Sequence, residues 1–161
     1  MGRDKAFIDY HGYPQYEWAA DLLEPHCEQV YISASERIST LLRRKCIVDQ
    51  WLEEGPLAAL LSAHLSLPDQ DIFLLPCDMP YLIGEDLSVL YNRFTDSPEL
   101  VHCYEYEGHL NPLFAVWPSC ILEQIAELFE RGERSPKRVM ERLGFVAHQA
   151  PDASRLRNVN E

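Results

Sequence analysis

The stretch Asp71-Ile72-Phe73-Leu74-Leu75-Pro76-Cys77-Asp78-Met79-Pro80 joins a short apolar run to an acidic residue just beyond it. The apolar run, 72–75, is typical of a β-strand that is buried on both faces, and Pro76 ends it. In open α/β sheets, ligands bind outside the carboxyl ends of the strands. Asp78 therefore stands where a metal-binding acid is expected, and Pro80 stiffens the segment that follows. A simpler interpretation is a buried strand with a polar turn after it, in which Asp78 only begins the next loop.

Charge and composition narrow the class of protein. The 161 residues carry a formal net charge of −12, which argues against a general nucleic-acid-binding protein. Local lysine or arginine side chains, or a bound metal, can still attract an anionic small substrate. The sequence contains no apolar run of membrane-spanning length and no recognisable signal peptide, and its five cysteines are scattered without CxxC spacing. We therefore expect one cytoplasmic domain over residues 1–161, with reduced thiols and no membrane contact.

Strand-like and helix-like segments alternate along the chain. β-Branched and aromatic residues mark the strands, and apolar residues at helical spacing mark the helices. This alternation predicts βαβ units and a mostly parallel sheet in an α/β layer sandwich. The expected strands are 29–34, 46–48, 72–75, 100–106, 113–117 and 145–148, and the expected helices are 15–23, 35–44, 56–65, 84–94, 119–129 and 136–143.

Three charged residues and one glycine are candidates for chemistry. Asp49 and Asp78 each follow a predicted strand, so both acids face one crevice if those strands are neighbours, and substrate phosphates would complete a Mg²⁺ site there. Lys5, within the segment 2–5, offers a point charge for a phosphate, and Gly55 precedes a helix N-terminus, which attracts anions. The alternatives are a solvated N-terminus for Lys5 and helix-capping or loop roles for the two acids.

Short motifs occur in one order along the whole chain. They are Gly2-Arg3-Asp4-Lys5-Ala6, Gly12-Tyr13-Pro14, Val30-Tyr31-Ile32-Ser33, Gly55-Pro56-Leu57-Ala58, Leu75-Pro76-Cys77-Asp78-Met79-Pro80, Asn111-Pro112-Leu113-Phe114-Ala115, Gly132-Glu133-Arg134-Ser135 and Asn158-Val159-Asn160. In this combination the sequence resembles the molybdenum cofactor guanylyltransferases, the molybdopterin-guanine dinucleotide synthases of the nucleotidyltransferase group. The Cys-Asp-Met-Pro segment and the closing Asn-Val-Asn are the most specific parts of the resemblance.

The resemblance implies a Rossmann-like three-layer sandwich with a mostly parallel sheet, of the nucleotide-diphospho-sugar transferase type. It implies an enzyme that transfers GMP from GTP to molybdenum-bearing molybdopterin and releases pyrophosphate, with Mg²⁺ as cofactor. By their positions in the motifs, Lys5 and Asp78 match the catalytic residues: Lys5 would hold the nucleotide phosphates and Asp78 would bind Mg²⁺. Asp49 and Gly55 match nucleotide-binding positions.

The resemblance also implies a molybdopterin side of the site. Asn158 and Asn160 match residues near the molybdopterin, and Asn111 and Pro112 match the opposite wall. The implied partners are GTP, the molybdopterin cofactor, and further molybdenum cofactor assembly proteins and client molybdoenzymes, with no nucleic acid or membrane.

The sequence departs from the family pattern at both of its ends. Members of the family carry a strand and a glycine-rich loop ahead of the segment that corresponds to residues 1–5, and they usually continue past the closing Asn-Val-Asn. We therefore expect a missing central strand, exposed strand edges, low stability and little catalytic activity in this chain alone. Two alternatives stay open: a related cytidylyltransferase, because base choice depends largely on that loop, and a non-catalytic homologue that binds partner proteins.

Overall fold

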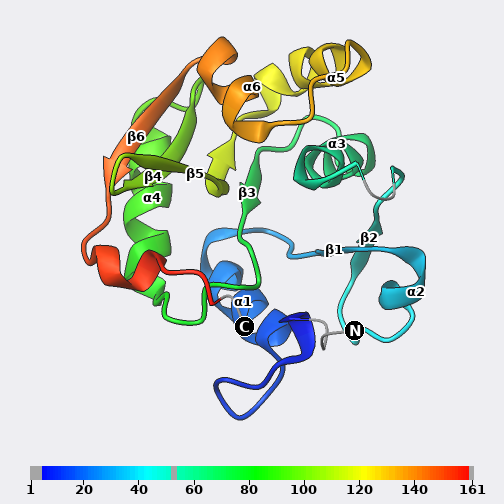
Figure 1. Ribbon diagram of the computed structural model, residues 1–161, viewed down its shortest axis with the longest axis vertical. Helices are drawn as coiled ribbons and strands as arrows, with labels where there is room; N and C mark the ends of the chain where they lie inside the picture. Colours follow the sequence, from blue (N-terminus) through cyan, green and yellow to red (C-terminus); the bar gives the residue numbers. More distant parts are fainter. Residues whose placement is uncertain (1–4, 52–53, 160–161) are drawn as a thin grey trace.

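The computed structural model describes residues 5–51 and 54–159 and has an α/β architecture, as the sequence predicts (Figure 1). Its strands are β1 (Ile32–Ala34), β2 (Cys46–Val48), β3 (Ile72–Leu74), β4 (Val101–Tyr106), β5 (His109–Trp117) and β6 (Phe145–Gln149). Its helices are α1 (Gln15–Leu23), α2 (Glu36–Ser39), α3 (Pro56–Ser66), α4 (Gly84–Asp96), α5 (Leu122–Glu130) and α6 (Pro136–Leu143), with 3₁₀ turns η1 (Lys5–Phe7), η2 (Glu24–His26), η3 (Ser119–Ile121) and η4 (Ala153–Leu156).

The strands form two sheets within the described ranges. One contains β1 and β2, and the other has the order β3-β5-β4-β6. The pairs β1–β2 and β4–β6 are parallel, whereas β5 runs antiparallel to both β3 and β4. The parallel arrangement expected from the sequence therefore holds for two of the four pairs, and the larger sheet is mixed because a hairpin inserts β5 between β3 and β4.

The β4–β5 hairpin corrects one predicted boundary. The sequence pattern places a strand at 113–117 after a loop, but β5 already begins at His109. The turn consists of Glu107 and Gly108, which have φ angles of 50° and 76°. Two positive φ angles match the tight hairpin turn whose twist suits the flanking strands. Asn111 and Pro112 therefore lie within a strand rather than in a loop.

The first sheet is smaller than the sequence pattern indicates. The predicted strand 29–34 is reduced to β1, and the predicted helix 35–44 is reduced to α2. The Ser35 hydroxyl caps α2 by accepting a hydrogen bond from the Ile38 amide at 3.4 Å. Beyond α2 the chain is polar and Leu41 is 60% exposed, so a longer helix would have little apolar surface to bury.

Helices cover both faces of the larger sheet, which gives three layers (Figure 1). On one face α3, α5 and α6 pack against Cys103, Ala115 and Trp117. On the other face α1 and α4 pack against Tyr104 and Phe114. The alternation of side chains along β4 and β5 sends neighbouring residues into these two separate cores. In the part of the chain that the structure describes, no helix combines the length and apolar character needed to span a membrane.

Candidate functional site

Lys5 and Asp78 form the central contact of the candidate site. Asp78 lies in the loop that follows β3, residues 75–80, which we call the Asp78 loop, and Lys5 begins η1. The Lys5 Nζ is 3.6 Å from the Asp78 Oδ2, with 43% and 24% of the two side chains exposed. An ion pair with this much exposure adds little to folding stability. Both groups are therefore reachable by a ligand that carries phosphate or a metal ion.

The C-terminal segment reaches the same loop. The Val159 amide donates a hydrogen bond to the Asp78 carbonyl oxygen at 2.9 Å. This bond puts Asn158 next to the Asp78 loop, although the two segments are far apart in the sequence. Asn160, the second residue predicted for the molybdopterin side, lies outside the described residues.

Arg155 and Asp86 hold the C-terminal segment in place. The Arg155 Nη1 lies 3.3 Å from the Asp86 Oδ1 and 3.4 Å from the Glu85 Oε2, both in α4. Burial raises the pKa of Asp86, and the Arg155 guanidinium opposes this rise. Leu156, in the same turn, is buried in the core beneath α4. The approach of residues 158 and 159 to the Asp78 loop therefore depends on a charged contact and an apolar one.

A bulge in β5 brings Asn111 and Pro112 close to the loop. In β4, Cys103 pairs with Ala115 of β5, whereas the next residue, Tyr104, pairs with Asn111. Residues 112–114 therefore have no partner in the ladder and form the bulge. Proline is tolerated within sheets at such bulges because it cannot donate to the ladder. The Pro112 carbonyl oxygen accepts a hydrogen bond from the Trp117 indole at 3.1 Å. The bulge is thereby tied to the core.

Asn111 connects this bulge to the Asp78 loop. Its Nδ2 lies 3.6 Å from the sulfur of Met79, and its Oδ1 accepts a hydrogen bond from the Phe114 amide at 3.1 Å. Met79 is fully buried, so its backbone and that of the adjacent Asp78 are fixed by packing. Lys5, Asp78, Asn111 and Asn158 are thus gathered around one loop.

Asp49 and Gly55 lie in the region of the smaller sheet. Asp49 directly follows β2, and its Oδ1 accepts a short hydrogen bond from the Ser33 hydroxyl. Gly55 is the N-cap of α3, with a φ of 82° that favours glycine. Because β2 and β3 belong to different sheets, Asp49 and Asp78 do not follow neighbouring strands. Sequence reasoning had not singled out Ser33 as the partner of Asp49.

His11 is a contact of the Asp78 loop that the sequence did not indicate. Its Nε2 lies 3.0 Å from the Pro80 carbonyl oxygen, and its ring stacks on Trp18 with 4.3 Å between centroids. Gly12, with a φ of 90°, turns the chain directly after it. The six histidines show no spacing that distinguishes His11 from the others, so only the fold reveals this contact.

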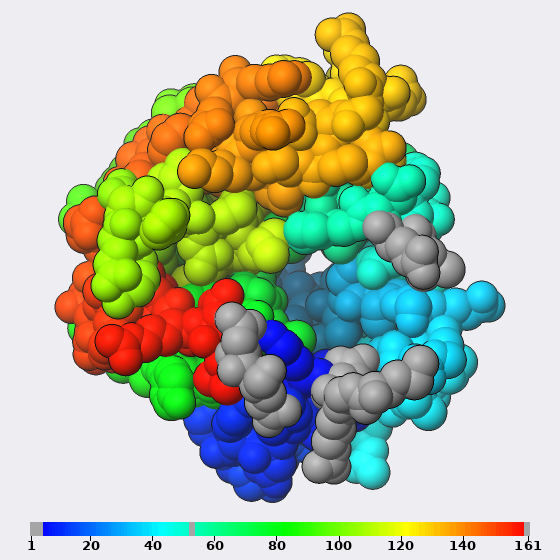
Figure 2. Space-filling model, in the orientation of Figure 1, coloured from blue at the N-terminus to red at the C-terminus, as the bar shows by residue number. Residues whose placement is uncertain are grey.

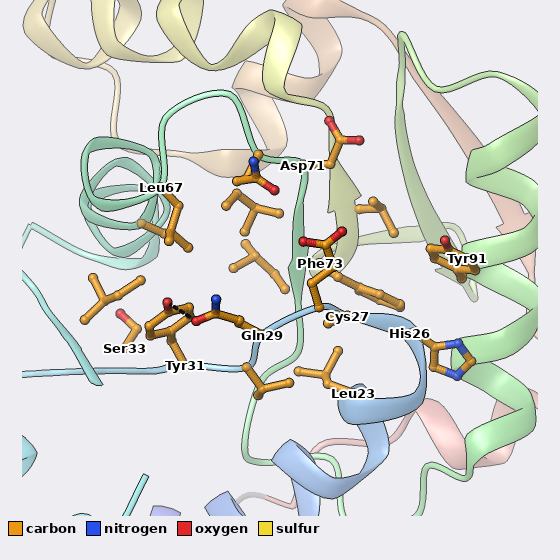
Figure 3. A pocket seen from close by; sticks show the side chains of 18 of the residues that line it. Leu23, His26, Cys27, Gln29, Tyr31, Ser33, Leu67, Asp71, Phe73 and Tyr91 are labelled. Atoms are coloured by element: carbon orange, nitrogen blue, oxygen red, sulfur yellow. Dashed lines mark hydrogen bonds between the residues drawn. The ribbon is translucent and has the colours of Figure 1, made fainter. Parts of the chain in front are cut away.

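A cavity of about 820 Å³ separates β1 from β3 (Figure 3). Tyr31 and Ser33 border it on one side, and Ile72 and Phe73 border it on the other. The space-filling view shows the molecule hollowed beside the blue and cyan segments that carry β1 and β2 (Figure 2). Burial raises the pKa of the Cys27 thiol in this cavity to about 11, so the thiol is neutral near pH 7. The described lining residues include neither Asp49 nor Asp78, but they include Ser33, whose hydroxyl donates the hydrogen bond to Asp49.

Comparisons of sequence identify the relatives of this chain. A family model described as MobA-like NTP transferase domain matches residues 1–149. The molybdenum cofactor guanylyltransferase of Ectopseudomonas mendocina is 28% identical over 163 residues, which cover 99% of this chain and 80% of the relative. The enzyme of the same name from Pseudomonas fluorescens is 29% identical, covering 99% and 82%. The family resemblance seen in the sequence motifs is thereby confirmed.

Comparisons of structure agree with the family match. A protein from Aquifex aeolicus has a TM-score of 0.79 at 22% identity, covering 90% of this chain and 78% of that one. The molybdopterin-guanine dinucleotide biosynthesis protein A of Archaeoglobus fulgidus has a TM-score of 0.75 at 20% identity, covering 92% and 76%. At these identities the likeness establishes a shared fold. Since the family model spans most of its length, the chain belongs to the MobA-like NTP transferase domain family, and it is a nucleotidyltransferase.

Proposed function

We propose that this chain transfers GMP from GTP to molybdopterin bearing molybdenum, with release of pyrophosphate. The observation that carries the proposal is the meeting of Lys5 and Asp78 beyond the carboxyl end of β3, where ligands of α/β sheets bind. Relatives that match 99% of the chain and are named molybdenum cofactor guanylyltransferases support the choice of GMP. The proposed partners are GTP and molybdopterin, together with further proteins of cofactor assembly and client molybdoenzymes.

We assign Asp78 as the residue that holds a divalent metal ion, and we propose Mg²⁺. This ion is usually bound through one or two carboxylates and completes its coordination with water and substrate phosphates. The single, partly exposed carboxylate of Asp78 fits that donor set. Among residues 5–51 and 54–159, no group of three or more histidine, cysteine, aspartate or glutamate side chains is arranged to hold a metal alone. When bound, Mg²⁺ supplies positive charge to the phosphoryl oxygens.

The remaining site residues have positioning and electrostatic roles in this proposal. The Lys5 ammonium neutralises charge that builds up on the departing pyrophosphate, while the molybdopterin phosphate attacks the α-phosphorus in line. Asn111 and Asn158 border the Asp78 loop, where they would orient the attacking molecule. Asp49 and Gly55 would contact the nucleotide from the smaller sheet. No side chain acts as a nucleophile.

The test measures Mg²⁺-dependent pyrophosphate release from GTP and molybdopterin, together with calorimetric GTP binding. We expect Asp78→Asn to lower release by at least about 100-fold, because it removes the charge that holds the metal. Its circular dichroism spectrum should match that of the unaltered chain, because the removed ion pair is weak. Glu127→Gln is the matched control, since this exposed carboxylate lies on a helix surface, where it pairs with Arg131 at 3.8 Å.

Two outcomes of this test would count against the proposal. Turnover unchanged in Asp78→Asn would remove Asp78 from the metal site. Absence of both GTP binding and pyrophosphate release with the unaltered chain would favour the non-catalytic, partner-binding alternative that follows from the sequence comparison with the family.

The choice between guanine and cytosine nucleotides needs its own experiment. A CMP:2-keto-3-deoxy-manno-octonic acid synthetase in complex with CTP has a TM-score of 0.69 to this chain, but at 11% identity the likeness shows only a shared fold. We expect GTP to bind in preference to CTP in a direct competition. Stronger binding of CTP would support the cytidylyltransferase alternative.

Two broader assignments stay predictions. We propose that residues 1–161 form one nucleotidyltransferase domain, although the strands of the described ranges are divided between two sheets. We also propose a cytoplasmic location, which the five free cysteines support because a reducing compartment keeps thiols unpaired.

A further inference from the structure

His11 belongs to a closed loop, residues 8–15, which we call the His11 loop. The Ile8 amide donates a hydrogen bond to the Lys5 carbonyl oxygen at 3.2 Å. The Ile8 carbonyl oxygen in turn accepts a hydrogen bond from the Gln15 amide at 2.9 Å. The base of the His11 loop is therefore attached to η1, the turn that carries Lys5.

The His11 loop has a defined shape. Asp9 and Pro14 pair across it as an isolated antiparallel bridge, and the Gly12 amide donates a hydrogen bond to the Asp9 Oδ1 at 2.5 Å. Gly12 has a φ of 90°, which a residue with a side chain rarely adopts. His11 stands directly before this turn, so its position follows from backbone contacts on both sides of it.

The His11 side chain bridges the His11 loop and the Asp78 loop. Its Nε2 lies 3.0 Å from the Pro80 carbonyl oxygen, and because a carbonyl oxygen can only accept, Nε2 carries the hydrogen of this bond. The imidazole ring stacks on Trp18 with 4.3 Å between centroids and 8° between planes. Trp18 packs against the core that also contains Met79. The ring that carries the donor is thus supported by the same core as the Asp78 loop.

Three consecutive residues of the Asp78 loop are each held by a different part of the protein. The Asp78 carbonyl oxygen accepts from the Val159 amide at 2.9 Å, Met79 is fully buried, and the Pro80 carbonyl oxygen accepts from His11. None of these contacts uses the Asp78 carboxylate. The backbone is therefore fixed on both sides of Met79 while the carboxylate is left for a ligand.

The direct contact between Lys5 and Asp78 is a poor way to fix their separation. The two side chains are partly exposed, and such an ion pair contributes little to stability. A divalent ion on Asp78 would also compete with the Lys5 ammonium for the same carboxylate, since the two cations repel each other. The bond from His11 to Pro80 uses neither of these charges, so it can persist when the metal is bound.

We propose that His11 is a positioning residue for the metal site. Its hydrogen bond to the Pro80 carbonyl oxygen holds the Asp78 loop in place relative to the segment that carries Lys5. Groups that orient a metal ligand in this indirect way commonly change metal affinity when they are removed. The inference rests on the proposed function, because it takes Asp78 as the ligand of a divalent ion.

The test compares two substitutions of His11 by direct binding of Mn²⁺, followed by its effect on water proton relaxation. His11→Phe keeps a ring that can stack on Trp18 but has no donor, whereas His11→Gln keeps an N–H donor of similar reach but has no ring. We expect about tenfold weaker Mn²⁺ binding in His11→Phe. Binding in His11→Gln should stay close to that of the unaltered chain.

Two further variants serve as checks. His11→Leu also lacks a donor, so it should weaken Mn²⁺ binding as His11→Phe does. Tyr13→Phe removes a different hydrogen bond of the same loop, from the Tyr13 hydroxyl to the Asp21 carboxylate at 3.2 Å, and it should leave Mn²⁺ binding unchanged. Urea midpoints show whether each variant is folded.

A kinetic measurement separates positioning from damage to the fold. In pyrophosphate release, His11→Phe should raise the Mg²⁺ concentration needed for half-maximal rate by the same factor by which it weakens Mn²⁺ binding. The rate at saturating Mg²⁺ should change little, because excess metal compensates for a ligand that is held less firmly. A general loss of folded protein would instead lower the rate at every Mg²⁺ concentration.

Three results would count against this role of His11. Mn²⁺ binding that is lost in Asp78→Asn but is equal in His11→Phe and the unaltered chain would overturn this inference and leave the metal site intact. Tighter binding by His11→Phe than by His11→Gln would assign His11 to packing on Trp18. Absence of Mn²⁺ binding by the unaltered chain would remove the metal site itself, and this inference with it.

Discussion

The two sheets of this protein differ in how they are supported. In the larger sheet β4 and β5 are long, and the buried residues that they share include Cys103, Tyr104, Phe114 and Trp117. In the smaller sheet β1 and β2 have three residues each, and Val48 is 44% exposed. A sheet that is covered on both faces is stabilised by the apolar side chains that it buries, whereas an isolated two-stranded sheet is only marginally stable in water. The smaller sheet therefore depends on the elements that attach it to the rest.

The largest expected effect is in the larger sheet. Trp117→Ala removes a fully buried side chain from the core under α3, α5 and α6, and we expect a loss of about 4 kcal/mol in the free energy of unfolding. Urea denaturation followed by circular dichroism measures this loss. A loss below about 1 kcal/mol would mean that the larger sheet is not the main source of stability.

A smaller effect is expected at a buried position of the smaller sheet. Ile47→Ala, in β2, should cost about 2 kcal/mol, at the low end for such truncations, because its short strand can adjust around the space. Hydrogen exchange should then accelerate in β1 and β2 before it does in β4 and β5. Equal acceleration in both sheets would show that they unfold as one unit.

Acid should weaken the larger sheet through two histidines. His102 in β4 and His148 in β6 are joined by a 2.9 Å contact between Nδ1 and Nε2, and burial lowers the pKa of both. In the unfolded chain the pKa of a histidine is about 6.5, and in the folded protein both values are lower. The contribution of the two histidines to the free energy of unfolding is therefore fully present above about pH 6.5 and is lost as pH falls through the folded pKa values. Urea midpoints at pH 7.5 and pH 5 measure this change.

Several groups around the histidine pair affect its titration. The Arg93 guanidinium also lowers the pKa of His148, while a hydrogen bond at Ser97 and the carboxylates of Glu99 and Asp96 raise that of His102. His148→Gln keeps a polar side chain and removes one titrating group, so it should flatten the pH dependence. An unchanged dependence would assign the acid sensitivity to other groups.

The smallest effect is expected where a charged side chain fastens the smaller sheet. Arg44, just ahead of β2, pairs with Glu17, Asp21 and Glu24 on or beside α1. We expect Arg44→Met to lower stability by about 1 kcal/mol, because these pairs are partly exposed, and the effect should shrink at high salt. Arg131→Met, which breaks an exposed helix pair, is the control and should have almost no effect.

Local patterns predicted the elements better than their assembly. The helix 15–23 and the strands 46–48 and 72–75 appear within a residue of their expected bounds. Their ends are determined by neighbouring residues, such as prolines, and by the spacing of apolar side chains, which the sequence shows directly. The β4–β5 boundary was misplaced because the turn depends on a positive φ at Glu107, a residue that seldom adopts one. The strand order of the larger sheet, with β5 between β3 and β4, could not be read from the sequence, since strand pairing depends on contacts between distant segments.

In the candidate site, too, the sequence predicted individual residues better than their arrangement. The acids at strand ends were recognisable from the apolar runs before them, and Lys5 was recognisable as a charge for phosphate. The roles of Asn111 and Asn158 came from family resemblance. Their arrangement around the Asp78 loop rests on contacts such as the Val159 amide to the Asp78 carbonyl oxygen, which no local pattern encodes. The attachment of His11 to the same loop was missed for that reason.

The hydrogen bond from the Val159 amide to the Asp78 carbonyl oxygen makes the Asp78 loop observable without any turnover assay. The exchange rate of one amide hydrogen reports how often that bond opens. A metal ion or nucleotide that steadies the loop should therefore slow exchange at Val159, so occupancy of the site can be followed from a backbone group that touches no ligand.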